Sequence, residues 1–214
     1  SHLAKSFLLG LLQNDARIIV FDINDEYSSL RYKPDGKFAS EFHDKILSVT
    51  PGVDLRLTLA YMGQEVFLDL MEAMGVRDAS LYQLRSIWEE LCEPGPVTLQ
   101  GINAQIEHIG TAAVKGALER RMDSLMQTSL VTDVEEESVT LEGLFGKLGD
   151  SGGALVVNLK GRDEVVMRAT VQTILSRLQE LLEFKTLKPI FLFAEEAHLY
   201  LHETDWIDAV TRIR

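Results

Sequence analysis

Apolar residues at the start of the chain recur with helical spacing, and a short buried run comes after them. The helical stripe lies within residues 1–14 and ends at the turn-prone pair Asn14-Asp15. Its members are Leu3, Phe7, Leu8, Leu11 and Leu12. Residues 17–21 are β-branched or aromatic apart from Arg17, which is typical of a strand buried in a parallel sheet. A helix, a short loop and a buried strand are the rhythm of an α/β fold.

The pattern changes to mostly helical between about residues 38 and 131. Breaks fall at Pro51-Gly52, Gly75, 94–96 and Gly110. Three apolar sets at helical spacing lie between them. They are Val66, Phe67, Leu70, Met71 and Met74; Leu81, Leu84, Ile87, Trp88 and Leu91; and Val114, Leu118, Met122, Leu125 and Met126. We therefore expect a helical subdomain at 38–131, with the acidic stretch 133–137 as its solvated exit loop.

The α/β rhythm resumes beyond that stretch. Residues 154–159 form an apolar run after Gly152-Gly153, 163–184 a long amphipathic helix, and 189–194 a second apolar run. Residues 204–214 have the pattern of a further helix. The sequence thus predicts an α/β core with a parallel sheet, built from residues 1–37 and 132–214 and interrupted by the helical subdomain.

Composition indicates the class of protein and its cellular location. The chain has 214 residues, of which 46% are hydrophobic, enough for a core without disulfides. Its single cysteine, Cys92, lies in an apolar-periodic segment, so we expect a buried, inert thiol and a cytoplasmic location. No apolar run approaches the roughly 20 residues of a membrane span. The net charge of −12 argues against a surface that coats itself in nucleic acid.

The segment 190–198 carries the clearest chemical signal. An apolar strand ends in two adjacent acids, Glu195 and Glu196, as in a Walker B motif. Phosphate-ester hydrolysis needs one group to hold Mg²⁺ and another to orient or deprotonate water. The usual first acid is aspartate, whereas this chain has Glu195. A strand that ends in a solvent-facing charged turn is the alternative interpretation.

A second acidic turn comes after the first predicted strand. Asp22 ends the strand, and Asp25, Glu26 and Tyr27 stand close behind it. This order resembles the segment after the second core strand of HerA-like ATPases, an aspartate, two variable residues, Gly, Glu and Tyr. Asp25 stands in place of that glycine. An ordinary strand-exit loop is again the alternative.

The two ends of the chain carry further signals. The P-loop motif G-x-x-x-x-G-K-[ST] is absent, but residues 1–8 resemble the segment that begins directly after its lysine, with Ser1 as the Mg²⁺-ligating hydroxyl. A Ser-His pair is also a common remnant of an expression tag. Near the other end, Arg212 and Arg214 resemble a basic pair that senses γ-phosphate; such a pair also complements a helix dipole.

The succession of these segments resembles the HerA/FtsK family of P-loop ATPases, which have a RecA-like parallel-sheet core. The resemblance implies a P-loop upstream of Ser1 and no ATP turnover by this chain alone. It implies a catalytic role for Glu196, with Arg212 and Arg214 at the γ-phosphate. The nucleotide- and Mg²⁺-binding residues that it implies are Ser1, His2, Asp22, Glu26 and Glu195, with Ser1 and Glu195 on the metal.

The same resemblance implies the partners of the intact protein. The protein would bind ATP and Mg²⁺ as a homo-oligomeric ring, hexameric in the family, and move duplex DNA through the pore of that ring. A nuclease or another effector is a further implied partner. Two alternatives remain open: a protein-handling ATPase related to type IV secretion motors, and a ring-forming scaffold or regulatory subunit that does not hydrolyse ATP.

Overall fold

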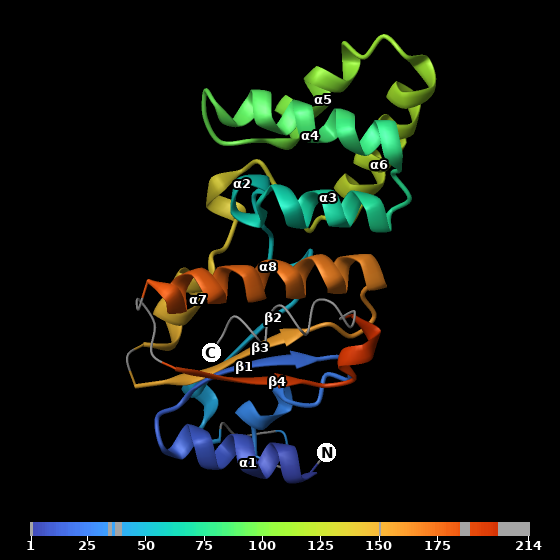
Figure 1. Ribbon diagram of the computed structural model, residues 1–214. Coiled ribbons are helices and arrows are strands. Elements are labelled where there is room, and N and C mark those ends of the chain that lie inside the picture. The colour runs from blue at the N-terminus through green and yellow to red at the C-terminus, as the bar shows by residue number, and fades with distance from the viewer. Residues whose placement is uncertain (1, 34–35, 37–39, 150, 185–188, 201–214) are drawn as a thin grey trace. The chain divides into compact units, whose positions relative to one another are not determined.

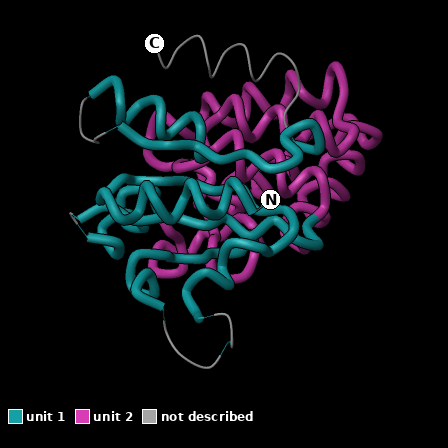
Figure 2. The backbone as a smooth tube through the Cα atoms, turned by 90° about the horizontal axis from the view of Figure 1, so that it is seen from below, with its two compact units in different colours: residues 1–51, 140–162, 174–214 teal, residues 52–139, 163–173 magenta. Residues whose placement is uncertain are grey.

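The computed structural model describes residues 2–33, 36, 40–149, 151–184 and 189–200 (Figure 1). The chain divides into two compact units (Figure 2). The α/β unit comprises residues 1–51, 140–162 and 174–214, and the helical unit comprises residues 52–139 and 163–173. The predicted α/β class is confirmed, because all the strand pairs of the sheet are parallel.

The sheet of the α/β unit has the order β2-β3-β1-β4. Its strands are β1 (Arg17–Asp22), β2 (Ile46–Val49), β3 (Gly153–Asn158) and β4 (Ile190–Ala194). In register, Asp22 at the end of β1 lies opposite Asn158, and Phe21 lies opposite Ala194. The carboxyl ends of β1, β3 and β4 therefore meet at one edge of the sheet, which is where open α/β sheets bind ligands.

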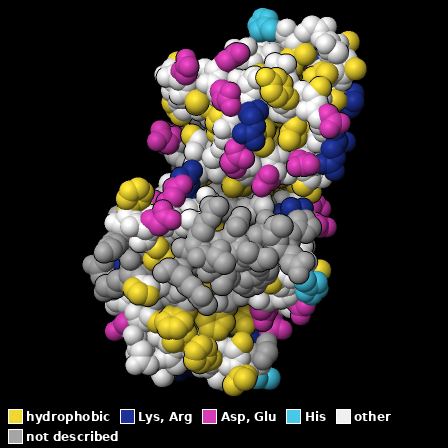
Figure 3. Space-filling model, in the orientation of Figure 1, with side chains coloured by type: hydrophobic (Ala, Val, Ile, Leu, Met, Phe, Trp, Pro, Cys, Tyr) yellow, Lys and Arg dark blue, Asp and Glu magenta, His cyan; other side chains and the backbone are white. Residues whose placement is uncertain are grey.

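Helix α1 (His2–Gln13) packs on the sheet through only part of its predicted stripe. Leu8 and Leu12 are buried in a core cluster with Ile18 and Val20. The sequence pattern places Leu3 and Phe7 on the same buried face, yet they are 80% and 57% exposed. Figure 3 accordingly shows hydrophobic side chains gathered over α1. The stripe is wider than the surface that the sheet covers.

The start of β3 shows why a glycine pair, Gly152-Gly153, stands there. Gly152 has φ +77°, and a Cβ there would lie 2.2 Å from the carbonyl oxygen of Asp15. The amide of Gly153 then donates to the carbonyl of Ala16 at 2.9 Å. Only glycine permits this close approach of the α1–β1 turn to β3.

The prediction of helical structure from residue 38 is wrong over residues 46–49. These residues form β2, which pairs with β3, and the compact helical unit starts at Gly52. Ile46 and Val49 are buried in the sheet. An apolar run of four residues is too short for periodicity to separate strand from helix, so the pairing with β3 decides its conformation.

The remaining helices agree only in part with the predicted patterns. The α/β unit includes α7 (Leu141–Leu148), and α8 (Glu164–Glu183) crosses the division between the units. The helices of the helical unit are α2 (Leu59–Met62), α3 (Gln64–Ala73), α4 (Asp78–Cys92), α5 (Leu99–Glu107) and α6 (Ala112–Gln127). Helices α3, α4, α6 and α8 match predicted patterns, whereas α2, α5 and α7 are not predicted individually. Buried residues such as Phe67, Leu84 and Leu118 come from the three predicted apolar sets. None of the described helices is both long and apolar enough to span a membrane.

Two details of the helical unit differ from the expectations drawn from its sequence. Cys92 is exposed rather than buried, because it ends α4 outside the buried positions of that helix. The acidic stretch 133–137 does more than separate elements. The carboxylate of Asp133 accepts the amides of Leu99 and Gln100 at 2.7 and 2.9 Å, which caps the first turn of α5.

Candidate functional site

Asp22 closes the turn after β1. Its side chain is fully buried, and its two carboxylate oxygens accept the amides of Glu26 and Tyr27 at 3.0 and 2.9 Å. A buried carboxylate needs such partners, since leaving it without hydrogen bonds in the interior is costly. Both oxygens of Asp22 therefore have a backbone partner within this turn.

Asp25 occupies the position where the family pattern has glycine. Its φ is +57°, in the left-handed region that glycine adopts most readily. Aspartate is among the few other residues that tolerate this conformation, because its short side chain can hydrogen-bond locally. Here that side chain accepts the hydroxyl of Ser28. The departure from the pattern thus preserves a left-handed turn.

Glu195 extends β4 beside the end of β1. Its amide donates to the carbonyl of Phe21 at 3.3 Å, and its carboxylate oxygen Oε1 accepts the hydroxyl of Tyr27 at 2.8 Å. The hydroxyl of Tyr200 donates to the main-chain carbonyl of Glu195 at 2.8 Å. Burial and the neighbouring Glu195 carboxylate raise the pKa of both tyrosines, so both hydroxyls remain donors.

Glu196 has a different environment from its neighbour. It is exposed, and its φ of +47° and ψ of +41° place it in the left-handed region. Nδ1 of His198 lies 3.6 Å from Oε2 of Glu196. A non-glycine residue held in this region is strained, and such strain is concentrated at functional sites. The turn leaves the Glu196 carboxylate accessible.

Lys5 joins the first half of α1 to this edge of the sheet. Its Nζ lies 2.7 Å from Oε2 of Glu26 and 5.9 Å from the ring centroid of Tyr27. The hydrogen bond and the charge of Lys5 lower the pKa of Glu26 below its usual range. Figure 1 shows the N-terminal half of α1 at the same end of the unit as the carboxyl ends of the strands. Tyr27 thus lies between Lys5 and Glu195.

The structure brings together four of the residues singled out from the sequence: Asp22, Glu26, Glu195 and Glu196. His2 is exposed at the first position of α1. Ser1, Arg212, Arg214 and the helix expected at 204–214 lie outside the described residues.

Sequence reasoning misses two residues that organise this site, Lys5 and Tyr200. Lys5 is the single Lys or Arg of α1, and its partner Glu26 is 21 positions away, so no local pattern identifies the pair. Tyr200 stands after the twin acids, but its burial beside Phe21, with ring centroids 6.1 Å apart, depends on the folded sheet. Tyr27 belongs to a recognisable motif, but nothing in that motif indicates its bond to Glu195.

The carboxylates at the carboxyl edge of the sheet suit Mg²⁺ better than a metal held by protein side chains alone. Within the described part of the chain, no group of three or more His, Cys, Asp or Glu side chains could hold a metal ion. Glu195 and Glu196 supply carboxylate oxygens, which Mg²⁺ prefers. Mg²⁺ commonly uses one or two carboxylates together with substrate phosphates and water. The site therefore fits Mg²⁺ shared with a bound nucleotide, and does not fit a closed metal centre.

Comparison with known proteins places the chain in a family. A search of curated proteins found no match. The family model described as "Helicase HerA, central domain" matches residues 1–178, which include α1, β1, β2, β3 and most of α8. The match covers well over half of the chain, and β4 with its two acids lies beyond it. Membership of a P-loop ATPase family implies that the intact protein uses nucleotide and Mg²⁺. The chain belongs to the family of the HerA helicase central domain.

Proposed function

We propose that this chain is part of the ATP-hydrolysing centre of a HerA-type motor that couples hydrolysis to translocation or unwinding of DNA. One observation carries the proposal: the acids that end β4 lie beside the turn after β1, and Tyr27 and Lys5 connect that turn to the first half of α1. In P-loop ATPases, that helix begins where the phosphates bind. This arrangement supports a phosphate-binding site beside the two acids.

Glu196 is the proposed catalytic residue. Its exposed carboxylate can accept a proton from the attacking water, or orient that water toward the γ-phosphate. Glu196 is exposed in this left-handed turn, so its side chain is accessible to a ligand. Glu195 has the other role, because Tyr27 and Tyr200 fix its side chain and its main chain. With Ser1, it would hold Mg²⁺, which neutralises charge that develops on the phosphates.

The other residues take less direct roles in this proposal. Asp22 would support the nucleotide site by shaping the turn, because each of its oxygens accepts a backbone amide there. Glu26 holds Lys5 at the edge of the site. His2 would lie near the nucleotide at the start of α1, and Arg212 and Arg214 would contact the γ-phosphate within the subunit or across a subunit boundary.

The proposed substrate is duplex DNA, threaded through the pore of a homo-hexameric ring, with a nuclease or another effector as a further partner of the family type. Family membership supports this choice over a protein substrate. The net charge of −12 is compatible with it, because a ring needs only a few basic groups along its pore.

The proposal is tested by Glu196→Gln in the intact protein. ATP turnover should fall by about 10²- to 10⁴-fold, the usual contribution of a general base, while ATP binding remains close to that of the parent. Turnover is measured by phosphate release and binding by equilibrium dialysis. Glu41→Gln is the matched control, because Glu41 is an exposed glutamate of the same unit that precedes β2.

Unchanged turnover in Glu196→Gln would remove Glu196 as the catalytic group. The parent protein is then assayed with and without duplex DNA. An increase in ATP turnover with duplex DNA supports the DNA motor. ATP turnover that is the same with and without DNA indicates a protein-handling ATPase. Nucleotide binding without any turnover in the parent would identify a non-hydrolysing scaffold instead.

A further inference from the structure

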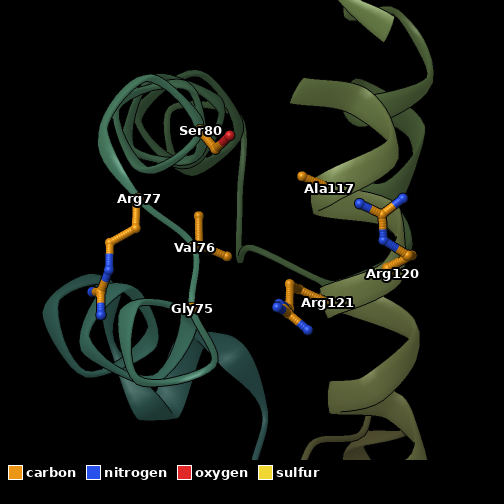
Figure 4. A pocket seen from close by; sticks show the side chains of 7 residues that line it. All are labelled: Gly75, Val76, Arg77, Ser80, Ala117, Arg120 and Arg121. Carbon is orange, nitrogen blue, oxygen red and sulfur yellow. The ribbon is translucent and has the colours of Figure 1, made fainter. Parts of the chain in front are cut away.

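A cavity lined by arginines lies within the helical unit. Its volume is about 220 Å³, and its walls come from the segment between α3 and α4, from α4, and from α6 (Figure 4). The lining includes Arg77, Arg120 and Arg121 and no carboxylate. Three exposed arginines thus line one small cavity in a chain whose net charge is −12.

Two of these arginines have no anionic partner among the described residues. Arg77 forms an ion pair with Glu72, with Nη1 and Oε1 2.9 Å apart. Arg120 and Arg121, by contrast, form no ion pair with any carboxylate in the described part of the chain. Neighbouring like charges repel, and an anion between them would relieve that repulsion. The cavity is therefore electrostatically suited to a negative ligand.

Two acidic residues of the surrounding helices are paired with other cations. On α6, Glu119 lies 3.7 Å from Lys115, one turn before it. On α3, Glu72 is the partner of Arg77. Both carboxylates are thus already shared with other cations, which leaves the charges of Arg120 and Arg121 for a ligand.

Gly75 keeps the cavity open opposite Arg121. A Cβ at Gly75 would lie 3.3 Å from Nη2 of Arg121, tighter than ordinary van der Waals contact. Its φ of +89° also lies in the region that favours glycine. Figure 4 shows the Arg121 side chain reaching from α6 toward Gly75, with the hydroxyl-bearing Ser80 on α4 across the cavity. Ser80 adds a neutral hydrogen-bond donor to the guanidinium groups.

The dimensions indicate the class of ligand. Pockets for drug-sized ligands are about 300–1,000 Å³, larger than this cavity. A single tetrahedral oxyanion is small enough, and guanidinium forks match phosphate oxygens bidentately. We propose that Arg120 and Arg121, with Ser80, form a binding site for one phosphate group, either a free phosphate or a phosphate of a DNA backbone. This site lies outside the proposed ATPase centre.

The first test uses inorganic phosphate and the full 214-residue chain. Arginine Nε–H signals are monitored by NMR during titration with phosphate, at an ionic strength kept constant with chloride. The expected result is a saturable shift of the Arg120 and Arg121 signals. In Arg120→Gln/Arg121→Gln, the phosphate affinity measured by calorimetry should fall at least tenfold.

The matched control is Arg85→Gln/Lys115→Gln. It removes two positive charges from α4 and α6, but both residues lie outside the cavity and are paired with glutamates. Phosphate affinity should match that of the parent. Circular dichroism checks that each variant is folded. If the double arginine variant unfolds, the phosphate titration of the parent is compared with that of Arg121→Lys. This variant keeps the positive charge but removes the bidentate guanidinium, so its phosphate affinity decides whether Arg121 binds phosphate.

The second test replaces phosphate with a short DNA duplex, and only this arm rests on the proposed function. If backbone phosphate is the ligand, the slope of log affinity against log salt should be shallower in the double variant, by about 0.9 for each phosphate that it no longer neutralises. An unchanged slope with intact phosphate binding identifies a free phosphate as the ligand. No saturable shift with phosphate, or equal affinities in the double variant and control, overturns the site, whatever the result with Glu196→Gln.

Discussion

The ends of β1 and β4 lie side by side at one edge of the sheet, and both are acidic, yet their carboxylates have opposite environments. Asp22 is fully buried, with two backbone amides on its oxygens. Glu196 is exposed, in a left-handed conformation, with the His198 ring nitrogen 3.6 Å away. The first carboxylate stabilises a turn, and the second is available to a ligand. Acidic residues at equivalent strand ends can therefore have different functions, and their burial distinguishes them.

The largest expected effect that tests this comparison comes from Asp22→Ala. It leaves the amides of Glu26 and Tyr27 without their acceptor, which should cost about 3 kcal/mol of unfolding free energy, since each unsatisfied buried group costs roughly 1–3 kcal/mol. Urea unfolding monitored by circular dichroism measures the decrease.

The control for Asp22 is Asp44→Ala. The Asp44 side chain is exposed, and its Oδ1 lies 2.9 Å from Nδ1 of the neighbouring His43, so a change within about 0.5 kcal/mol is expected. Equal unfolding midpoints for the Asp22 variant and this control would show that the buried carboxylate does not stabilise the turn.

A smaller effect is expected at Asp25, which shapes the same turn. Alanine there keeps the strained left-handed φ and removes the acceptor for Ser28, whereas glycine adopts that φ freely. We expect Asp25→Gly to be more stable than Asp25→Ala by about 1 kcal/mol, the cost of a left-handed residue with a Cβ. The reverse order in thermal unfolding would indicate that the turn does not need this conformation.

The smallest effect concerns the ion pair of Lys5 and Glu26 at the rim. Lys5 lowers the pKa of Glu26, so the pair stabilises the fold above the unfolded-state pKa of glutamate, about 4.3, and this contribution disappears as pH falls through the lower folded-state pKa. In Lys5→Met the Glu26 pKa, measured by carbon-detected NMR titration, should rise toward its ordinary value. Added salt should shrink the difference between parent and variant, because the pair is partly exposed. A Glu26 titration that is the same in both chains would exclude Lys5 as its cause.

Most secondary structure can be predicted because its signals are local. The long periodic pattern of 163–184 corresponds to α8, and the apolar runs before Asp22 and Glu195 correspond to β1 and β4. β2 cannot be recognised in this way, since its four residues are ordered by β3, more than 100 positions later. The exposure of Leu3 and Phe7 has a related reason: periodicity finds an apolar face, but the neighbouring surface decides how much of it is buried.

The candidate site shows the same division. Its acids are identified from strand-then-acid motifs, which are contiguous in the sequence. The different roles of Asp22 and Glu196 cannot be identified from the sequence, because they depend on burial and on hydrogen bonds that form only after folding. Asp25 is a further example. The sequence shows that glycine is missing from this position, but only the backbone φ of +57° shows that the left-handed turn is kept.

By itself, the sequence determined the α/β class, the helical unit and the acidic strand ends, because periodicity and turn chemistry act over a few residues. Tertiary structure alone decided that the Tyr27 hydroxyl reaches Glu195, 168 positions away, and that Arg77, Arg120 and Arg121 surround one cavity. Those arrangements depend on which elements pack together. Packing joins residues that no local pattern connects, so their chemistry emerges only in the folded chain.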